Sequence, residues 1–225
     1  MSEAAARVRG HTPDLFGAVR EVHSERLAAG ACLLRGLCLD QATALLAAIE
    51  AVTSAAPFRH WVTPGGFRMS VAMTNCGDLG WISDSSGYRY AACDPQSGRP
   101  WPAMPDVFLR LARQAAQAGG FSNFRPTACL VNRYEPGARL TLHQDKDELD
   151  LSAPIVSVSL GLPAVFLFGG NARQDRPRRV PVQHGDVVVW GGPARLYYHG
   201  VLALKAGNHE ILGAQRVNLT FRRAG

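Results

Sequence analysis

The stretch Arg216-Val217-Asn218-Leu219-Thr220-Phe221-Arg222 alternates strictly between polar and apolar side chains. Successive side chains of a β-strand point to opposite faces, so this alternation predicts a strand with one polar and one apolar face. A polar face turned to solvent would explain the pattern without any function. Two arginines on an inward face would instead require anionic partners, because an unpaired buried charge is very costly. A short dicarboxylate would fit between them, since the arginine fork binds a carboxylate through two hydrogen bonds.

Further strand-like runs lie on the N-terminal side of this stretch. They are Ala128–Tyr134, Ile155–Leu160, Val165–Phe168, Asp186–Trp190 and Arg195–His199. Turn signals such as Gly169-Gly170 and Gly191-Gly192-Pro193 separate the runs. Roughly eight short strands at this spacing predict a sandwich or jelly roll. We therefore expect residues 127–223 to form the core of the fold.

Two helices and a short strand are predicted before this core. Residues 1–24 show no periodicity and are interpreted as a loose, flexible leader, and residues 30–37 are compatible with a short strand. Asp40 is a suitable N-cap for a helix from Gln41 to Val52. A second helix is predicted over Asp106–Ala118, between a proline and a glycine pair. The expected fold class is α+β, mainly β, with N-terminal helices.

The segment from Pro57 to Pro102 has a different character. Closely spaced turn signals separate short strand-like pieces such as Phe67–Thr74. Tryptophans and tyrosines are scattered among them: Trp61, Trp81, Tyr88, Tyr90 and Trp101. Any one of these rings is adequately explained as a buried hydrophobe. As a set in a glycine-rich segment, these rings indicate a flexible segment that covers a bound substrate. Residues 57–102 are therefore interpreted as a lid.

The composition is that of a globular protein with a basic surface. The chain has 225 residues, 47% of them hydrophobic, and a formal net charge of +6. This length fits one domain with embellishments, and we expect residues 25–225 to form it. The positive charge makes an anionic partner plausible, with nucleic acid the first candidate. Five cysteines without a Cys-x-x-Cys pair argue against a disulfide framework or a zinc knuckle.

No part of the sequence has the apolar run of a signal peptide or of a membrane span. Together with the unpaired cysteines, this favours a reducing compartment. We therefore expect a cytoplasmic protein with no membrane partner.

A second stretch, Leu140-Thr141-Leu142-His143-Gln144-Asp145-Lys146-Asp147-Glu148, contains the pair His143-x-Asp145. Residues two apart on a strand share a face, so an imidazole and a carboxylate can bind one metal ion. His199, in Tyr197-Tyr198-His199-Gly200, would complete a set of two histidines and one carboxylate. This facial triad leaves coordination positions open and is typical of non-haem Fe(II) oxygenases. His-x-Asp alone is a weak signal, and the other motifs give it weight.

The predicted strand Ala128–Tyr134 offers a second polar pair, Asn132 and Tyr134, two residues apart. An amide and a phenol on one face can add hydrogen bonds to the same dicarboxylate. Both residues are also ordinary near the end of a strand. The pair therefore gains meaning only beside the other motifs.

Taken in order, these motifs resemble the AlkB family of Fe(II)/2-oxoglutarate dioxygenases, and its bacterial members in particular. The ordered set is Asn132-x-Tyr134, His143-x-Asp145, His199 and Arg216-x-Asn218-x-Thr220-x-Arg222. The longer matching stretches are Val62–Gly66, Met69–Gly77, Leu142–Glu148 and His184–Gly192. The resemblance covers all but the leader. It implies a double-stranded β-helix (jelly-roll) core under a nucleotide-recognition lid, and DNA repair by oxidative demethylation of alkylated bases such as 1-methyladenine and 3-methylcytosine.

The resemblance also implies roles for the motif residues. Fe(II) would be bound by His143, Asp145 and His199, with an open position for O₂. Arg222 would pair with the distal carboxylate of 2-oxoglutarate. The other implied contacts to this co-substrate are Asn132, Tyr134, Arg216 and Asn218. The reaction would release succinate, CO₂ and formaldehyde.

The implied lid receives a base that has left the duplex stack, because a stacked base cannot reach such a pocket. In the family, the flipped base lies between an aromatic ring, matched here by Trp81, and the imidazole of the first iron ligand, His143. A carboxylate at Asp147 would favour a cationic methylated base over a neutral one. The other residues interpreted as substrate contacts are Thr63, Met73, Tyr88, Glu148 and Arg173.

Two departures from the family pattern lie in the lid: Asp78, where a histidine is expected, and residues 82–87. They leave open the preferred lesion and the choice between DNA and RNA. We expect a monomer that acts on alkylated DNA, preferably single-stranded, with RNA as a second candidate. Two alternatives remain: a dioxygenase acting on a methylated tRNA or a protein side chain, and a jelly-roll binding module without activity.

Overall fold

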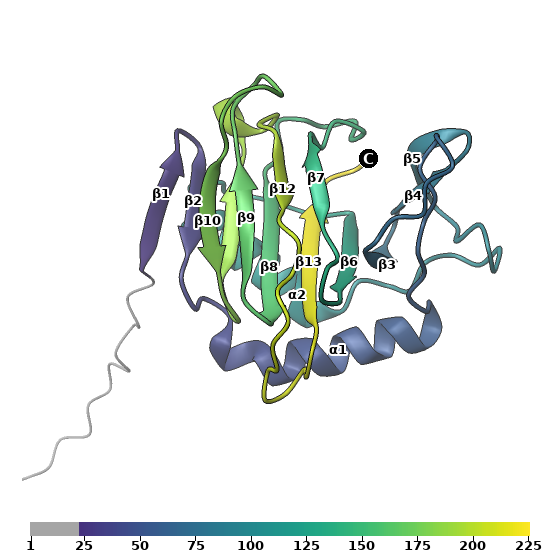
Figure 1. The fold of residues 1–225 in the computed structure, drawn as a ribbon. Coiled ribbons are helices and arrows are strands. Elements are labelled where there is room, and N and C mark those ends of the chain that lie inside the picture. The colour runs from purple at the N-terminus through teal and green to yellow at the C-terminus, as the bar shows by residue number, and fades with distance from the viewer. Residues whose placement is uncertain (1–22) are drawn as a thin grey trace, which may run out of the picture.

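Two antiparallel β-sheets face each other in the computed structural model, and two α-helices cover the outer face of the larger sheet (Figure 1). The structure describes residues 23–225. Residues 1–22, which make up most of the predicted leader, lie outside this range. The arrangement confirms the predicted fold class, which is mainly β with few helices.

The larger sheet has seven strands in the order β1-β2-β11-β8-β13-β6-β3. They are β1 (Ser24–Ala28), β2 (Ala31–Leu34), β3 (Ala72–Gly77), β6 (Ala128–Tyr134), β8 (Ile155–Gly161), β11 (Val187–Trp190) and β13 (Arg216–Arg222). Neighbouring strands are antiparallel throughout. The strand with the two arginines, β13, lies between β6 and β8 and is buried along its whole length.

The smaller sheet has four strands in the order β10-β9-β12-β7. They are β7 (Leu140–His143), β9 (Ala164–Phe168), β10 (Arg178–Val182) and β12 (His199–Val201). Between the sheets, the rings of Phe166 and Phe168 pack against Trp190 at centroid distances of 5.8 and 6.3 Å. The strands after residue 127 thus form the two-sheet sandwich expected of a jelly roll.

Three helical elements lie on the other side of the larger sheet: η1 (Leu39–Gln41), α1 (Ala42–Ala55) and α2 (Asp106–Ala118). The short turn η2 (Gly192–Ala194) follows β11, and its Ala194 belongs to the buried cluster between the sheets. Val217, Leu219 and Phe221 of β13 belong to the buried cluster that includes both α-helices, and Phe221 lies edge-on to Phe108 of α2 at 5.9 Å. The polar side chains of β13 therefore point inward, toward the smaller sheet.

The strands β4 (Gly80–Asp84) and β5 (Gly87–Ala91) form a separate hairpin beside β3 (Figure 1). The Asn75 side chain in β3 anchors it, because it donates to the Trp81 carbonyl and accepts from the Trp81 amide, both at 3.0 Å. The predicted cover over residues 57–102 is therefore only partly separate, since its strand β3 is the edge of the larger sheet.

Some sequence-based boundaries are wrong. Asp40 lies within η1, the N-cap of α1 is Gln41, and its side chain makes no cap hydrogen bond. The predicted strand Arg195–His199 is mostly a turn, and only His199 belongs to β12. The predictions also lack β1, which has no buried residue, and β10, which is only five residues long and contains Pro181. None of the helices within residues 23–225 has the length and apolar character needed to cross a membrane.

Candidate active site

Three metal-binding side chains lie together at one end of the sandwich. His143 ends β7 and is paired with His199, the first residue of β12. Asp145 follows two residues after β7, and its carboxylate oxygens are 3.7 Å from Nε2 of each histidine. All three ligand atoms lie within 4.8 Å of one another. The pairing of two short strands therefore joins residues that are 56 positions apart in the sequence.

The backbone determines which nitrogen of each histidine is free. Nδ1 of His143 is 2.8 Å from the Thr141 carbonyl, and Nδ1 of His199 is 3.0 Å from the Tyr197 carbonyl. A carbonyl oxygen only accepts hydrogen bonds, so both Nδ1 atoms carry the proton. Both Nε2 atoms, which are the nitrogens near Asp145, therefore keep a lone pair for a metal.

Burial and charge keep His199 and Asp145 in the protonation states that bind metals. Burial lowers the pKa of His199 to about 4, so its imidazole stays neutral near pH 7. Burial alone would raise the pKa of Asp145, but the charges of Arg222 and the two histidines bring it below its usual range. Neutral imidazoles and an ionised carboxylate are the forms that metals bind. Two neutral imidazoles and one carboxylate make the facial triad suited to Fe(II).

Arg222, the last residue of β13, holds Asp145 in place. Its Nε and Nη2 atoms are 2.8 and 2.7 Å from Oδ2 of Asp145. Both side chains are buried, so this charge-assisted pair is only weakly screened. The contact fixes the orientation of the carboxylate toward the histidines.

Arg216, at the other end of β13, is buried without an acidic partner among residues 23–225. Its Nη2 donates to Ser159 Oγ at 2.9 Å, whereas Nε and Nη1 have no hydrogen-bond partner in the described part of the chain. The ring of Tyr134, its neighbour across the β6–β13 pair, lies 4.9 Å from the guanidinium. Burial lowers the pKa of Arg216, since a buried cation without a partner is unfavourable. An anion bound to Nε and Nη1 would remove this cost.

Asn132 and Asn218 face each other between the two arginines. They are paired across β6 and β13, with Nδ2 of Asn132 3.3 Å from Oδ1 of Asn218. Asn218 also donates to Ser157 Oγ and to the Val158 carbonyl, both at 2.8 Å. Oδ1 of Asn132 is buried without a partner in the described part of the chain. Oδ1 can only accept, so Asn132 would reach an anionic ligand through the second proton of Nδ2, whereas Asn218 is occupied by the sheet.

The order of residues along β13 gives its two arginines different positions. Arg222 contacts Asp145, while Arg216 lies six residues earlier, about 20 Å away along an extended strand. A dicarboxylate that reaches from the metal into the sandwich meets Arg216 at its far end. In this geometry Arg222 lies beside the metal-binding carboxylate, and Arg216 with Tyr134 lies at the far end of the strand pair.

The lid hairpin brings three predicted substrate residues together. Trp81 Nε1 donates to Oδ2 of Asp147 at 3.2 Å. The rings of Trp81 and Tyr88 stack at a centroid distance of 5.5 Å. An aromatic face and an exposed carboxylate therefore meet two residues beyond Asp145 in the chain.

Glu148, in contrast, does not face a substrate. Its side chain is 2% exposed and lies 3.1 Å from Arg195 and 3.4 Å from Arg222. The hydroxyl of Tyr90 in β5 donates to it at 2.7 Å. The interpretation of Glu148 as a substrate contact does not fit this burial, because three protein groups already surround the carboxylate. Glu148 joins the lid hairpin to the arginine that orients Asp145.

The remaining predicted contacts are spread out. Met73 is buried in β3 opposite Asn132, so it lines the sheet and not the exposed lid as expected. Thr63 Oγ1 accepts from the Phe67 amide at 3.1 Å within a tight turn. Arg173 is exposed, with its guanidinium 5.9 Å from the ring of Tyr198, the neighbour of His199. Of these three, Arg173 lies at the rim of the triad.

Tyr90 and Arg195 are site residues that the sequence motifs do not identify. The spacing of Tyr90 is a signal that could have identified it, because residues two apart on a strand such as β5 share a face, and Tyr90 lies two residues after Tyr88. Arg195 donates through Nη1 to the Asp145 carbonyl at 2.7 Å and through Nε to the Ala153 carbonyl at 3.0 Å. Because Arg195 lies in a turn, no periodic pattern points to it.

Comparison with known proteins agrees with this geometry. The model of the 2OG-Fe(II) oxygenase superfamily matches residues 30–222. The alpha-ketoglutarate-dependent dioxygenase AlkB of Escherichia coli (strain K12) is 58% identical over 212 residues, covering 94% of this chain and 98% of that protein. The nucleic acid dioxygenase ALKBH1 of Homo sapiens is 40% identical over 123 residues, 55% of this chain and 31% of that protein. The solved structure of OsALKBH1 has a TM-score of 0.78 and 30% identity, covering 89% of this chain and 100% of that chain.

These findings confirm the predicted enzyme class and its requirements for Fe(II), 2-oxoglutarate and O₂. They exclude the alternative of a binding module without activity. The chain belongs to the 2OG-Fe(II) oxygenase superfamily and, within it, to the alpha-ketoglutarate-dependent dioxygenases of the AlkB family.

Proposed function

We propose that this dioxygenase repairs DNA by oxidatively demethylating alkylated bases, with 1-methyladenine and 3-methylcytosine as its substrates. The observation that carries the proposal is the contact between Trp81 and Asp147 beside the metal-binding residues. An aromatic face can stack on a flipped base, and a carboxylate attracts the positive charge created by methylation of a ring nitrogen. The 58% identity to AlkB of Escherichia coli supports the same reaction.

In this proposal, Fe(II) is held by Nε2 of His143, Nε2 of His199 and the carboxylate of Asp145. The distal carboxylate of 2-oxoglutarate pairs with Arg216 and Tyr134. The unpartnered Nε and Nη1 atoms of Arg216 support this assignment, because a buried guanidinium needs an anion. The further co-substrate contacts we propose are Asn132 directly, and Asn218 and Arg222 through the side chains that they orient.

The bound iron, 2-oxoglutarate and O₂ supply the oxidation that hydroxylates the alkyl carbon, giving succinate, CO₂ and finally formaldehyde. The chain's own residues position and shield the reactants. His143, with 37% of its side chain exposed, presents one ring face to a base that stacks on Trp81. Phe166 and Trp190 lie 6.0 and 4.9 Å from the His199 ring and keep water away from that side.

We call the space between the rings of Trp81 and His143 the base slot. In this proposal, residues at its rim supply the remaining substrate contacts. Tyr88 is 46% exposed and stacked on Trp81, which suits contact with the backbone that flanks the lesion. Arg173 is exposed near His199 and is placed to approach a phosphate. Thr63 takes part through its turn, whereas Met73 and Glu148 act indirectly, from buried positions.

A panel of damaged oligonucleotides tests the proposal. The protein is incubated with Fe(II), ascorbate, 2-oxoglutarate and oligonucleotides that carry 3-methylcytosine, 1-methyladenine or an etheno-bridged base, and the repaired base and formaldehyde are measured. We expect turnover of both methylated bases, faster in single-stranded DNA because a paired base must first be flipped. No turnover of any DNA lesion, together with turnover of a methylated peptide, would contradict the proposal.

RNA is the second candidate substrate. The human relative is named a nucleic acid dioxygenase, which supports substrates beyond DNA. Recognition of the base alone does not separate DNA from RNA, since that distinction needs contacts to the 2′-hydroxyl. We expect the same lesion in a matched single-stranded RNA to be repaired, and a complete failure on RNA would restrict the function to DNA.

We also propose that the enzyme is a cytoplasmic monomer, with residues 25–225 as one domain in which residues 57–102 carry the lid and residues 127–223 the jelly-roll core. All five cysteines are free thiols, which suits a reducing compartment. The family match across residues 30–222 supports a single domain. A dimer mass in light scattering, or recovery outside the cytoplasmic fraction of cells, would contradict this part of the proposal.

A further inference from the structure

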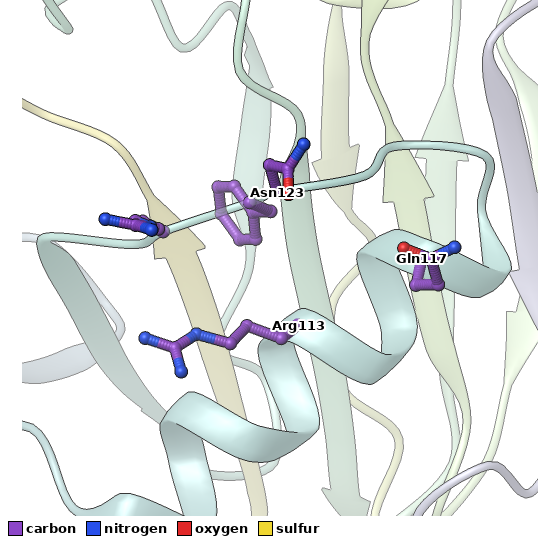
Figure 2. A pocket seen from close by; sticks show the side chains of 5 residues that line it. Arg113, Gln117 and Asn123 are labelled. Carbon is purple, nitrogen blue, oxygen red and sulfur yellow. The ribbon is translucent and has the colours of Figure 1, made fainter.

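A basic hollow lies on the helix-covered side of the larger sheet. It has a volume of about 360 Å³ and is lined by Arg113, Gln117, Asn123, Phe124 and Arg125. Figure 2 shows Arg113 and Gln117 on α2 and Asn123 in the loop that follows. Both arginines are exposed, and none of the residues that line this hollow is acidic. The hollow therefore presents positive charge and hydrogen-bond donors to solvent.

A second hollow continues the first. It has a volume of about 370 Å³, shares Asn123, Phe124 and Arg125, and extends to Asp150, Ser152 and Arg223. Arg223 lies 3.4 Å from Asp150, yet half of its side chain remains exposed. We call the two hollows together the basic trough. Its lining includes three arginines and one carboxylate.

The basic trough reaches the end of the sheet where the candidate active site lies. The Thr127 amide donates to the Arg222 carbonyl at 3.0 Å, and the Leu149 amide donates to the Ala224 carbonyl at 3.2 Å. These bonds join the loop before β6, the loop after β7 and the C-terminal tail. Asp150 of the trough is three residues from Asp147 of the base slot.

We propose that the basic trough binds the phosphate backbone of the strand that flanks the lesion. The proposal rests on the proposed function, because the occupant is the same nucleic acid. Guanidinium forks and side-chain amides suit phosphate oxygens as hydrogen-bond donors. Contacts of this kind position a strand without reading its sequence. Such binding suits a repair enzyme that meets damage in any sequence context.

Because of its position, the trough should contribute to the binding of nucleic acid on only one side of the lesion. A strand whose damaged base occupies the slot leaves it in two directions, 5′ and 3′. Only the direction that crosses residues 147–152 meets Arg223, then Arg125 and Arg113. The trough should therefore strengthen binding of oligonucleotides with a long flank on one side of the lesion, and not on the other.

Matched variants test this inference. Arg113→Gln/Arg125→Gln removes two charges from exposed positions of the trough while keeping hydrogen-bonding side chains. Arg26→Gln/Lys205→Gln removes two charges from exposed positions outside it, in β1 and in the loop before β13. Thermal unfolding checks that both variants fold.

Binding is measured by fluorescence anisotropy on the full chain with Mn(II) and 2-oxoglutarate, over a series of salt concentrations. The probes carry 3-methylcytosine: one of about five nucleotides with a central lesion, and two of about fifteen with the lesion near the 5′ or the 3′ end.

We expect the trough variant to bind one of the two long probes several-fold more weakly and to bind the short probe as the wild type does. The log–log slope of the salt dependence for that long probe should fall by about 0.7 for each phosphate that the variant no longer neutralises. The control variant should match the wild type. Equally weakened binding in both variants, or wild-type binding of all probes by the trough variant, would overturn the inference. An acidic peptide serves as a further probe. If the trough variant binds this peptide more weakly but binds all oligonucleotides as the wild type does, the trough serves a protein partner and the inference is overturned.

Turnover of the short probe separates the two claims. If the wild type does not demethylate it, the proposed function fails, whatever the anisotropy shows. If the wild type demethylates it and no one-sided effect exists, only the basic trough loses its role.

Discussion

A few buried atoms determine what this site binds. Both histidines use Nδ1 on a backbone carbonyl and so keep Nε2 for a metal. Arg222 is satisfied by Asp145, whereas Arg216 keeps two nitrogens without a partner in the described part of the chain. In our proposal the unsatisfied group lies where the anionic co-substrate binds. The site is therefore less stable than its packing would allow, and the ligand completes it.

Replacing Arg216 by methionine should separate stability from binding. The free energy of unfolding of the ligand-free protein should stay equal or rise by about 1 kcal/mol, because an apolar side chain replaces an unpaired buried cation. 2-Oxoglutarate should raise the Tm of the wild type and leave that of the variant unchanged. Differential scanning fluorimetry with and without 2-oxoglutarate measures both effects. A variant that still responds to 2-oxoglutarate would place the distal carboxylate elsewhere.

Asp147 should select for charge. The Asp147→Asn variant keeps an oxygen that can accept from Trp81 Nε1 but loses the negative charge. We expect its preference for 3-methylcytosine over a neutral lesion to fall by about fivefold to tenfold, the size of one exposed charge interaction. Competition assays with the two lesions in one sequence measure the preference. Iron and 2-oxoglutarate affinities serve as controls, and an unchanged preference would refute the role.

His199 should make the metal-free protein sensitive to acid. Its pKa falls from 6.5 to about 4 on folding, mainly because of burial, so the folded state disfavours the protonated ring. Stability is therefore complete above pH 6.5 and declines as the pH falls toward 4, by up to about 3 kcal/mol. Urea unfolding over this range measures the decline, and His199→Gln should flatten it. An equally steep decline in that variant would show that other groups cause it.

At the scale of elements, a chain of contacts ties the lid hairpin to the metal-binding carboxylate. Tyr90 of β5 donates to Glu148, and Glu148 lies beside Arg222, which holds Asp145. The hairpin is thus anchored at two places, at Asn75 in β3 and at Glu148. The anchoring sets the distance between the base slot and the triad.

Removing the Tyr90 hydroxyl should loosen the hairpin without touching the metal. For Tyr90→Phe we expect the free energy of unfolding to fall by about 1–3 kcal/mol, because buried Glu148 loses a donor. The KM for an oligonucleotide should rise while iron affinity stays close to that of the wild type. Tyr197→Phe is the matched control, since it also removes a hydroxyl and keeps the ring packed on Phe168 at 5.6 Å. An unchanged KM in Tyr90→Phe would contradict the anchoring role.

The elements differ in how far the sequence predicts them. β6, α2 and β13 have their predicted bounds, because each carries a full period of its pattern and clear end signals. β1 and β10 are not predicted because each is only five residues long, β1 buries none of its side chains, and β10 buries only Val180 and Val182. The triad was predictable as a motif. The buried position of Glu148 was not, since it depends on Arg195 and Tyr90, which are far apart in the sequence.

At the scale of the whole molecule, the two faces of the larger sheet have separate tasks. The outer face packs its apolar residues on the helices and forms one of two buried apolar clusters. The inner face and the smaller sheet hold the polar residues of the site between them. The lid hairpin of β4 and β5 lies beside β3 at one edge of the sandwich (Figure 1). The basic trough includes Arg223 of the C-terminal tail, so in our proposal a single strand of nucleic acid contacts both the hairpin and the trough.

The most direct test of the central claim is the product balance on an oligonucleotide that contains 3-methylcytosine. Succinate, formaldehyde and restored cytosine are quantified in one reaction for the wild type and for Asp145→Ala. We expect equal amounts of the three products from the wild type. The variant should bind the oligonucleotide and restore no cytosine. Restored cytosine at the wild-type rate in Asp145→Ala, or wild-type succinate without formaldehyde and cytosine, would contradict the account.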